Sequence, residues 1–283
     1  MEQSNSWYNW YSKLADTYTS QQRKNWYSEA ADAYNRVRPR YPKELIRRVV
    51  ELAQLPSEAL ILEVGCGPGT ATTAFAELGF SMICLEPSPE SCQLVRQNCT
   101  QYPDVEILNT TFEEWELESE RFNAVLAATS FHWVSPKIGF PKAAEALKDN
   151  GSLIALWNTA LQPSYEVCQV LNEIYQLEAP SIAHYKERKT EEEELRIFGQ
   201  NVIDSGYFQD LVSEQLVCEA TYSIDDYLTL LSTYSPYIAL DQQKRTSLFE
   251  GLREALERTC GRNIHLSYLS AFHIAKKNIA VVD

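Results

Sequence analysis

Three glycines stand two residues apart in the run EVGCGPGT at residues 63–70, at positions Gly65, Gly67 and Gly69. The apolar stretch before this run predicts a strand, and the spacing of apolar residues after it predicts a helix. A strand, a glycine turn and a helix form the nucleotide-binding unit of doubly wound α/β domains. Here the third glycine comes one residue earlier than in the dinucleotide fingerprint. The turn should therefore let the backbone approach a ligand that need not carry a phosphate.

A carboxylate ends the second predicted strand. Residues 81–85 are mostly apolar, and Glu86 follows them directly before Pro87. A carboxylate at this strand end can accept two hydrogen bonds from ribose hydroxyls. Sites for nicotinamide dinucleotides also bind ribose through a carboxylate at this strand end, so the residue does not identify the cofactor. The alternative is a solvated glutamate at a strand end.

An aromatic ring and a carboxylate, Phe112 and Glu113, follow the third predicted strand. The ring could stack on a purine, and the carboxylate could accept from an exocyclic amine. The alternative is an ordinary loop with a glutamate at a helix start.

The fourth predicted strand leads into the run TSFHW at residues 129–133. Polar groups at this strand end should lie near the reacting atoms. Histidine side chains ordinarily titrate near neutral pH, so His132 could act as a general base. It could equally orient a substrate or cap the next segment.

An alternation of strands and helices must position these motifs. Strands are predicted at residues 59–64, 81–86, 104–109, 122–128 and 152–157, with helices at 43–54, 70–78, 89–100 and 137–148. This pattern predicts a doubly wound, mostly parallel sheet with helices on both faces. Ligands bind such sheets beyond the carboxyl ends of the strands.

The flanking segments should cover this edge of the sheet. In residues 1–41, one predicted helical face holds Trp7, Tyr11, Leu14 and Tyr18, and a second holds Trp26, Ala30 and Tyr34. Later segments are expected as helices at 163–178 and 190–205, a bent strand at 207–221, helices at 223–231 and around 248–256, and a strand at 264–276. We expect one compact domain in four parts: a helical lid (1–41), a Rossmann-like cofactor-binding core (42–160), a helical insertion or lid (161–206), and the remaining core (207–283).

Composition excludes several classes of function. The 283 residues carry a formal net charge of −14 and no basic patch, so nucleic acid and anionic membranes are poor partners. Seven cysteines form no C-x-x-C pair and do not cluster with the four histidines, so no metal site is expected. Neither a signal peptide nor a membrane-spanning run is evident, and we expect a cytoplasmic protein.

Together these motifs resemble those of class I S-adenosylmethionine-dependent methyltransferases. The resemblance rests on the glycine run, on LEPS at residues 85–88 and on TSFHW at residues 129–133. Residues 34–42 are similar to a segment before the first strand in the methyltransferase type 11 branch, which includes the trans-aconitate methyltransferases. The resemblance covers about residues 26–158. It implies a seven-stranded sheet whose last strand, 264–276, runs antiparallel.

The resemblance also implies roles for individual residues. Those bordering the cofactor would be Glu63, Gly65, Cys66, Gly67 and Gly69 at its methionine part, Glu86 and Pro87 at ribose, Phe112 and Glu113 at adenine, and Thr129 at the methionine end. Tyr34 and Arg38 would close over the cofactor carboxylate or the substrate. His132, Trp133 and Arg38 would face the acceptor.

The implied reaction moves a methyl group from S-adenosyl-L-methionine to a small molecule and leaves S-adenosyl-L-homocysteine. The sulfonium methyl is already activated, so a base is needed only where the acceptor must lose a proton. A carboxylate needs none, and Arg38 could pair with an acceptor of this kind. Two other hypotheses about the function stay open. One is a catalytically silent cofactor-binding or interaction protein, and the other is a nicotinamide-dependent oxidoreductase, which the early third glycine disfavours.

Overall fold

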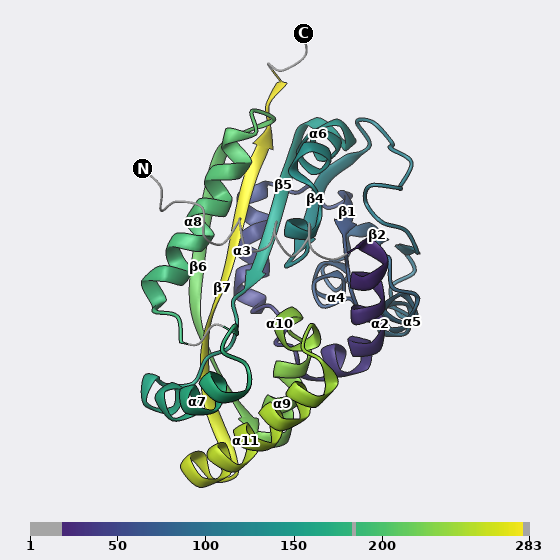
Figure 1. The fold of residues 1–283 in the computed structure, drawn as a ribbon. Coiled ribbons are helices and arrows are strands. Elements are labelled where there is room, and N and C mark those ends of the chain that lie inside the picture. Colours follow the sequence, from purple (N-terminus) through teal and green to yellow (C-terminus); the bar gives the residue numbers. More distant parts are fainter. Residues whose placement is uncertain (1–18, 183–184, 280–283) are drawn as a thin grey trace.

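A seven-stranded sheet forms the centre of the protein (Figure 1). The computed structural model describes residues 19–182 and 185–279. Its strands are β1 (Leu60–Val64), β2 (Ser81–Leu85), β3 (Val105–Leu108), β4 (Phe122–Ala128), β5 (Leu147–Asn158), β6 (Phe208–Ser223) and β7 (Asn263–Lys277). Their order is β3-β2-β1-β4-β5-β7-β6; β1 to β5 pair in parallel, and β7 runs antiparallel to β5 and β6. The predicted sheet and its antiparallel closing strand are confirmed.

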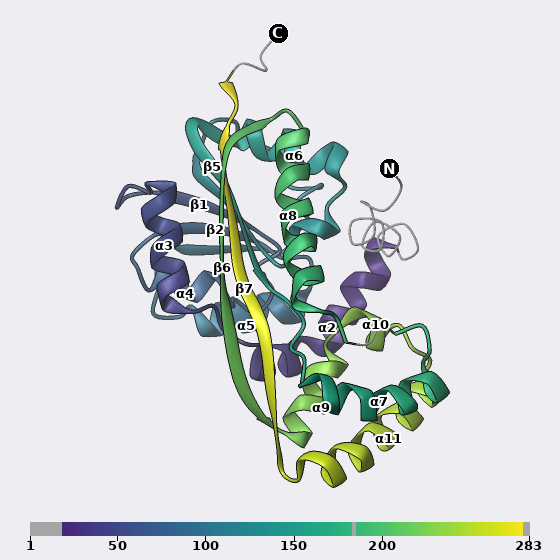
Figure 2. The same ribbon diagram turned by 90° about the vertical axis from the view of Figure 1, so that its left-hand side faces the viewer.

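Helices cover both faces of the sheet (Figure 2). On one face lie α3 (Lys43–Ala53), α4 (Thr72–Ala76) and α5 (Pro89–Asn98), and on the other lie α6 (Pro136–Ala146) and α8 (Arg188–Asp204). Side chains of β5 alternate between the two cores, with Leu153 and Ala155 on the α6 side and Ile154 and Leu156 on the α3 side. This is the period of two that a strand buried on both faces requires.

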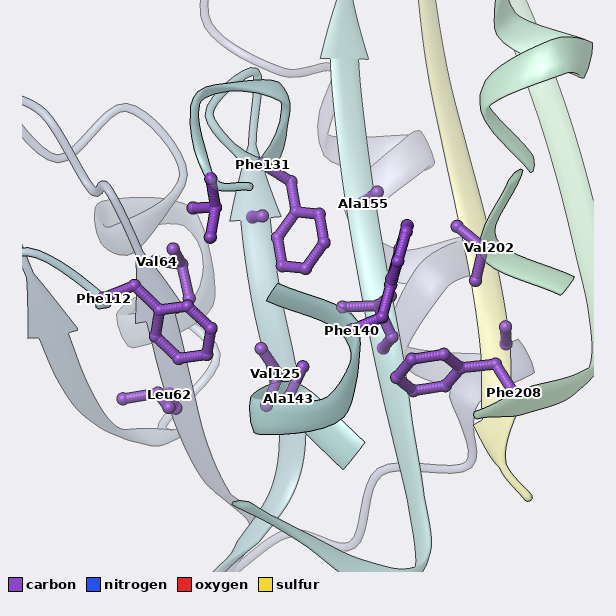
Figure 3. Close-up of a cluster of buried hydrophobic side chains, with 14 of the residues drawn as sticks. Leu62, Val64, Phe112, Val125, Phe131, Phe140, Ala143, Ala155, Val202 and Phe208 are labelled. Atoms are coloured by element: carbon purple, nitrogen blue, oxygen red, sulfur yellow. The ribbon is translucent and has the colours of Figure 1, made fainter. Parts of the chain in front are cut away.

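Aromatic rings fill much of the core on the α6 side. Phe131, Phe140 and Phe208 follow one another across it, with ring centroids 5.4 and 6.3 Å apart (Figure 3). Leu62 of β1 and Val125 of β4 pack into the same cluster from the sheet. The carboxyl ends of the strands are thus held by a closely packed layer.

Two boundaries differ from the sequence prediction. Helix α6 ends at Ala146, and β5 begins at once at Leu147. The residues between the predicted helix at 137–148 and the predicted strand at 152–157 instead form an irregularity within β5, where the register with β4 shifts between Phe122 and Ala124. A glycine tolerates such a bulge because it has no Cβ to clash with neighbouring backbone.

A third hydrophobic cluster surrounds the far halves of β6 and β7, which pair out to Ser223 and Asn263, beyond the rest of the sheet. The helices around this ribbon are α7 (Tyr165–Glu178), α9 (Ile224–Ser232), α10 (Ser235–Ile238) and α11 (Gln242–Cys260), at the lower end of Figures 1 and 2. Ser223 caps α9, because its hydroxyl accepts from the amide of Asp226 at 3.1 Å.

Helix α2 (Ser20–Val37) lies between the sheet domain and this helical cluster. Ser28 contacts Ser88 beside α5 (Oγ–Oγ 3.0 Å), and Arg36 pairs with Asp226 of α9 at 2.7 Å. The predicted face formed by Trp7, Tyr11, Leu14 and Tyr18 lies outside the described residues. Within the described part of the chain, no helix combines the length and apolar character needed to cross a membrane.

Candidate functional site

A cavity of about 580 Å³ lies at the carboxyl ends of the parallel strands. One side is formed by the turns after β1, β2, β3 and β4, and the other by α2, α7, α8, α9 and α10. This volume is within the range of small-molecule sites. The sequence-predicted site residues that line it are Tyr34, Arg38, Gly65, Cys66, Gly67, Glu86, Pro87, Phe112, Glu113, Thr129, His132 and Trp133.

The three glycines of the first turn have different surroundings, although all have positive φ. A Cβ on Gly67 would meet no heavy atom within 4 Å, and Gly67 lines the cavity. A Cβ on Gly65 would come within 2.9 Å of the Ser130 Cβ, and one on Gly69 within 2.8 Å of the Val95 Cγ2. Gly67 therefore leaves space for a ligand, whereas Gly69 does not line the cavity and permits close packing with α5.

Glu86 joins the first and second turns. Its Oε2 accepts from the Gly67 amide and its Oε1 from the Ser88 amide, both at 2.8 Å. Burial raises the pKa of this carboxyl to about 7, although the two amides favour the charged form. Each carboxylate oxygen can accept a further bond, so Glu86 can receive hydroxyl donors from a ligand in the cavity.

Glu63 is completely buried and does not line the cavity. Its Oε2 accepts from the Thr72 hydroxyl at 2.6 Å, which joins β1 to α4. Burial is the main cause that raises its pKa to about 7. The structure thus places Glu63 behind the glycine turn, where it can act on a ligand through the turn.

Phe112 and Glu113 border the cavity after β3. The Phe112 ring stacks on Trp115, with centroids 6.1 Å apart and planes 11° apart. Phe112 is only 3% exposed, so most of its ring packs in the core and only a small part can contact a ligand. Pro87 and Glu86 line the neighbouring part of the wall.

The end of β4 has a strained backbone. Thr129 has a φ of +54°, which is rare for a β-branched residue. Its amide donates to the Leu156 carbonyl at 2.8 Å, and its hydroxyl contacts the Tyr41 hydroxyl at 2.9 Å. Strain of this kind persists where surrounding contacts hold it, and it is common at functional sites.

His132 and Trp133 lie on the 3₁₀ turn η1 (Phe131–Trp133) and line the cavity. The His132 ring centroid is 4.9 Å from that of Trp133 and 5.5 Å from that of Trp157. Tyr27 meets Trp133 edge to face at 6.0 Å, so this end of β4 contacts the lid helix α2. His132 is therefore held among aromatic rings at the wall where β4 ends.

The face of α2 that lines the cavity contains Tyr34 and Arg38, and it shares only Tyr34 with the helical face of Trp26, Ala30 and Tyr34 noted in the sequence. It presents Tyr27, Ala31, Tyr34 and Arg38, at helical spacing, whereas Trp26 and Ala30 lie outside the lining. The register follows from contacts distant in sequence, including Tyr27 to Ser235 at 3.1 Å. Trp7 and Trp10 lie outside the described residues.

Arg38 is held from the opposite side of the cavity. Its Nε donates to the Thr233 hydroxyl and its Nη2 to the Thr233 carbonyl, both at 2.8 Å. Its guanidinium carbon lies 3.9 Å from the Tyr234 ring centroid and 4.7 Å from that of Tyr34. These rings stabilise the cation by cation–π contacts.

Residues 224–240 form a part of the wall from which the sequence prediction names no site residue. We expected helices at 163–178 and 190–205 to supply the cover, and α7 and α8 do line the cavity. However, α9, α10 and their connection also line it, with Tyr227, Tyr234 and Tyr237. The tyrosines clustered in this stretch are the signal that the sequence offers, although the sequence prediction places 207–283 in the remaining core.

Comparisons with known proteins agree with this architecture. Residues 61–151 match the family model described as a methyltransferase domain. A 125-residue segment is 35% identical to an uncharacterized methyltransferase of Mycobacterium tuberculosis, over 44% of this chain and 48% of that protein. The chain thus spans about half the length of the curated relatives it matches.

Two solved structures show the same fold. A protein described as a type II methyltransferase from Anaeromyxobacter dehalogenans is similar with a TM-score of 0.63 and 20% identity, over 84% of this chain and 97% of that one. Phosphoethanolamine N-methyltransferase 2 of Haemonchus contortus, solved with phosphomonomethylethanolamine and S-adenosylhomocysteine, is similar with a TM-score of 0.50 and 15% identity, over 88% and 57% of the two chains. Residues 61–151 are thus similar to a methyltransferase domain, and the sheet has the Rossmann-like fold of these methyltransferase structures.

Proposed function

We propose that this protein transfers a methyl group from S-adenosyl-L-methionine to a small molecule. The observation that carries the proposal is the contact between the Gly67 amide and the Glu86 carboxylate, 2.8 Å apart, at the wall of a cavity covered by helices. The methyltransferase domain match over residues 61–151 supports the same activity. Assignment to the type 11 branch, with trans-aconitate methyltransferases as relatives, stays a prediction from the sequence motifs.

The described residues fit this cofactor. Gly67 leaves open space at the turn, and Glu86 has acceptor capacity for ribose hydroxyls. Phe112 and Glu113 suit the adenine end, and Thr129 suits the methionine end beside the turn. Glu63 and Gly69 would act indirectly, by fixing the turn against α4 and α5.

When bound, S-adenosyl-L-methionine supplies a methyl group already activated by its sulfonium, so alignment matters more than acid or base chemistry. The chain's own contribution is then to hold the acceptor and to exclude water. We assign this enclosure to α2, α7, α8, α9 and α10, which together with α11 form the lid. His132 would take a proton only from an acceptor that must lose one.

A small acceptor that carries a carboxylate is the substrate we favour, because the Arg38 guanidinium lines the cavity. The net charge of −14 supports a small molecule over nucleic acid. The scattered free cysteines support a location in the cytoplasm.

Calorimetric titration with S-adenosylhomocysteine and with NAD tests the cofactor assignment. We expect binding and thermal stabilisation by S-adenosylhomocysteine but not by NAD. A ligand at 100 times its Kd should add about 2.7 kcal/mol of stability. The absence of both heat and stabilisation with saturating S-adenosylhomocysteine would contradict the proposal. A protein that binds it but methylates none of a panel of acids, phenols and amines would instead be a silent binding protein.

A further inference from the structure

The helical half of the cavity is rich in tyrosines whose hydroxyl groups are already engaged. Tyr27 contacts Ser235 at 3.1 Å, Tyr175 contacts Tyr237 at 2.6 Å, and Tyr234 accepts from the Leu161 amide at 3.1 Å. Burial raises the pKa of Tyr27 and of Tyr175 to about 12, so both are neutral near pH 7. This half of the cavity therefore offers ring surface to a ligand.

Arg38 is a charged group held among these rings. Thr233, which is completely buried, occupies its Nε and Nη2, and Thr233 in turn donates its hydroxyl proton to the Leu230 carbonyl at 2.7 Å. Tyr34 and Tyr234 bracket the guanidinium. The cation is thus fixed in one orientation, and its Nη1 donates to no acceptor among the residues that the structure describes, so it can serve a ligand.

The other charged groups nearby are mostly compensated within the protein. Lys186 pairs with Glu194 at 2.8 Å, and Glu191 pairs with Arg188 at 3.1 Å. Lys24, the remaining cation of the lining, interacts with Glu90. Among residues 19–182 and 185–279, no carboxylate lies within 4.0 Å of Arg38. A partly buried guanidinium without an anion favours a ligand that supplies one.

We propose that Arg38 binds the carboxylate of the methyl acceptor, that Thr233 positions Arg38, and that the acceptor is a flat monocarboxylic acid whose body lies against the tyrosine rings. The inference rests on the proposed function. Thr233 and Tyr234 belong to the lid, outside the matched methyltransferase domain at 61–151, and we assign this subsite to the acceptor. A tricarboxylate would fit poorly, since Glu86, Glu113, Glu191 and Glu194 also line the cavity.

Calorimetry on the protein saturated with S-adenosylhomocysteine tests this proposal. The probes are cinnamate, its uncharged amide and trans-aconitate. We expect cinnamate to bind more tightly than the other two. Arg38→Gln should weaken cinnamate binding by about 10- to 100-fold and leave amide binding unchanged, because only the charged hydrogen bond is lost. The Kd of S-adenosylhomocysteine should stay the same.

Thr233 and Arg36 supply the controls. Thr233→Val should weaken cinnamate binding by about 3- to 10-fold, since it removes the acceptor for Nε, and Thr233→Ser should restore it. Arg36→Gln removes a guanidinium from the same helix, where it pairs with Asp226 on the surface, and should have no effect on either ligand.

Three results would overturn the assignment. One is a loss of S-adenosylhomocysteine affinity in Arg38→Gln with cinnamate binding intact, which would place the cofactor carboxylate on Arg38. Another is equal or tighter binding of trans-aconitate or the amide, and the third is no cinnamate binding to the wild type. If S-adenosylhomocysteine itself fails to bind the wild type, the proposed function fails, whereas cinnamate titration of the free protein still tests Arg38.

Discussion

At the scale of single residues, the site depends on a glycine and a carboxylate that belong to different turns. The Gly67 amide donates to the Glu86 carboxylate, and this hydrogen bond fixes the turn after β1 relative to the turn after β2. The arrangement needs a residue without a Cβ at position 67, both for its φ of +57° and for the open space beside it.

Gly67→Val should abolish S-adenosylhomocysteine binding while the protein stays folded. Its side chain would enter the cavity, and the positive φ would also cost stability, about 1–3 kcal/mol. Gly206→Val is the matched control, because Gly206 has a φ of +80°, open space around it and no place in the cavity lining. Titration of both variants should show binding only in the control. Unchanged affinity in Gly67→Val would mean that the turn is purely structural.

The raised pKa of Glu86 predicts that cofactor affinity depends on pH. Its folded value of about 7 lies above the ordinary value of 4.5, so the free protein favours the protonated carboxyl. Ribose hydroxyls would favour the ionised form, so affinity should rise roughly tenfold from pH 6 to pH 8. Calorimetry in buffers of different ionisation enthalpy should detect release of a proton on binding. For the free protein, burial of this carboxyl makes stability fall as pH rises from about 4.5 to about 7.

Two variants isolate the contribution of Glu86. Glu86→Gln should weaken binding and remove its pH dependence. Glu63→Gln should keep that dependence, because Glu63 has a similarly raised pKa but does not line the cavity. The assignment of Glu86 to ribose fails if the pH dependence follows Glu63 instead.

At the scale of elements, the glycine turn is also the place where β1, α4 and α5 pack together. Gly69 lets the turn approach α5 so closely that a Cβ would lie 2.8 Å from the Val95 Cγ2. Thr72, at the start of α4, ties the same turn to Glu63 of β1. The turn is thus held by two helices before any ligand binds, which lowers the entropic cost of binding.

Gly69→Ala should reduce stability and leave the Kd of S-adenosylhomocysteine nearly unchanged. The new methyl group would press on Val95, and φ is +91° at this position. We expect a loss of about 1–3 kcal/mol in denaturant unfolding. The double variant Gly69→Ala/Val95→Ala should lose less than the sum of its single variants, because the clash is relieved. Strict additivity would argue against this packing role.

At the scale of the whole molecule, the protein divides into a sheet domain and a helical lid on a shared β-ribbon. Strands β6 and β7 extend past the sheet, and α7, α9, α10 and α11 bury their far halves in a separate cluster (Figure 2). Helix α2 then bridges the two parts. We expect the lid to open locally at a lower free energy than global unfolding.

Leu252→Ala tests this division. Leu252 of α11 is completely buried in the lid cluster, and its truncation should cost about 2–5 kcal/mol. Amide exchange in α7, α9 and α11 should accelerate, and cinnamate binding should weaken more than S-adenosylhomocysteine binding. Leu62→Ala, in β1, is the control and should impair both ligands. A parallel loss of both ligands in Leu252→Ala would show that the two parts are one cooperative unit.

The sheet could be predicted because its signals are local. Buried parallel strands leave apolar runs in the sequence, and the glycines between residues 65 and 69 mark the first turn. The parallel topology then places Glu86, Phe112 and His132 at one edge, since ligands approach such sheets from the carboxyl ends of the strands. Those residues line the cavity as expected.

Only the tertiary structure decided the acceptor side. The face of α2 that points inward depends on Tyr27 meeting Ser235, and the orientation of Arg38 depends on Thr233, 195 residues away in the sequence. Such contacts arise when separate elements pack together, and they leave no period or spacing in the sequence. The amino-acid sequence therefore determined the sheet and the cofactor-facing turns of this protein, while packing of distant helices decided which side chains meet the acceptor.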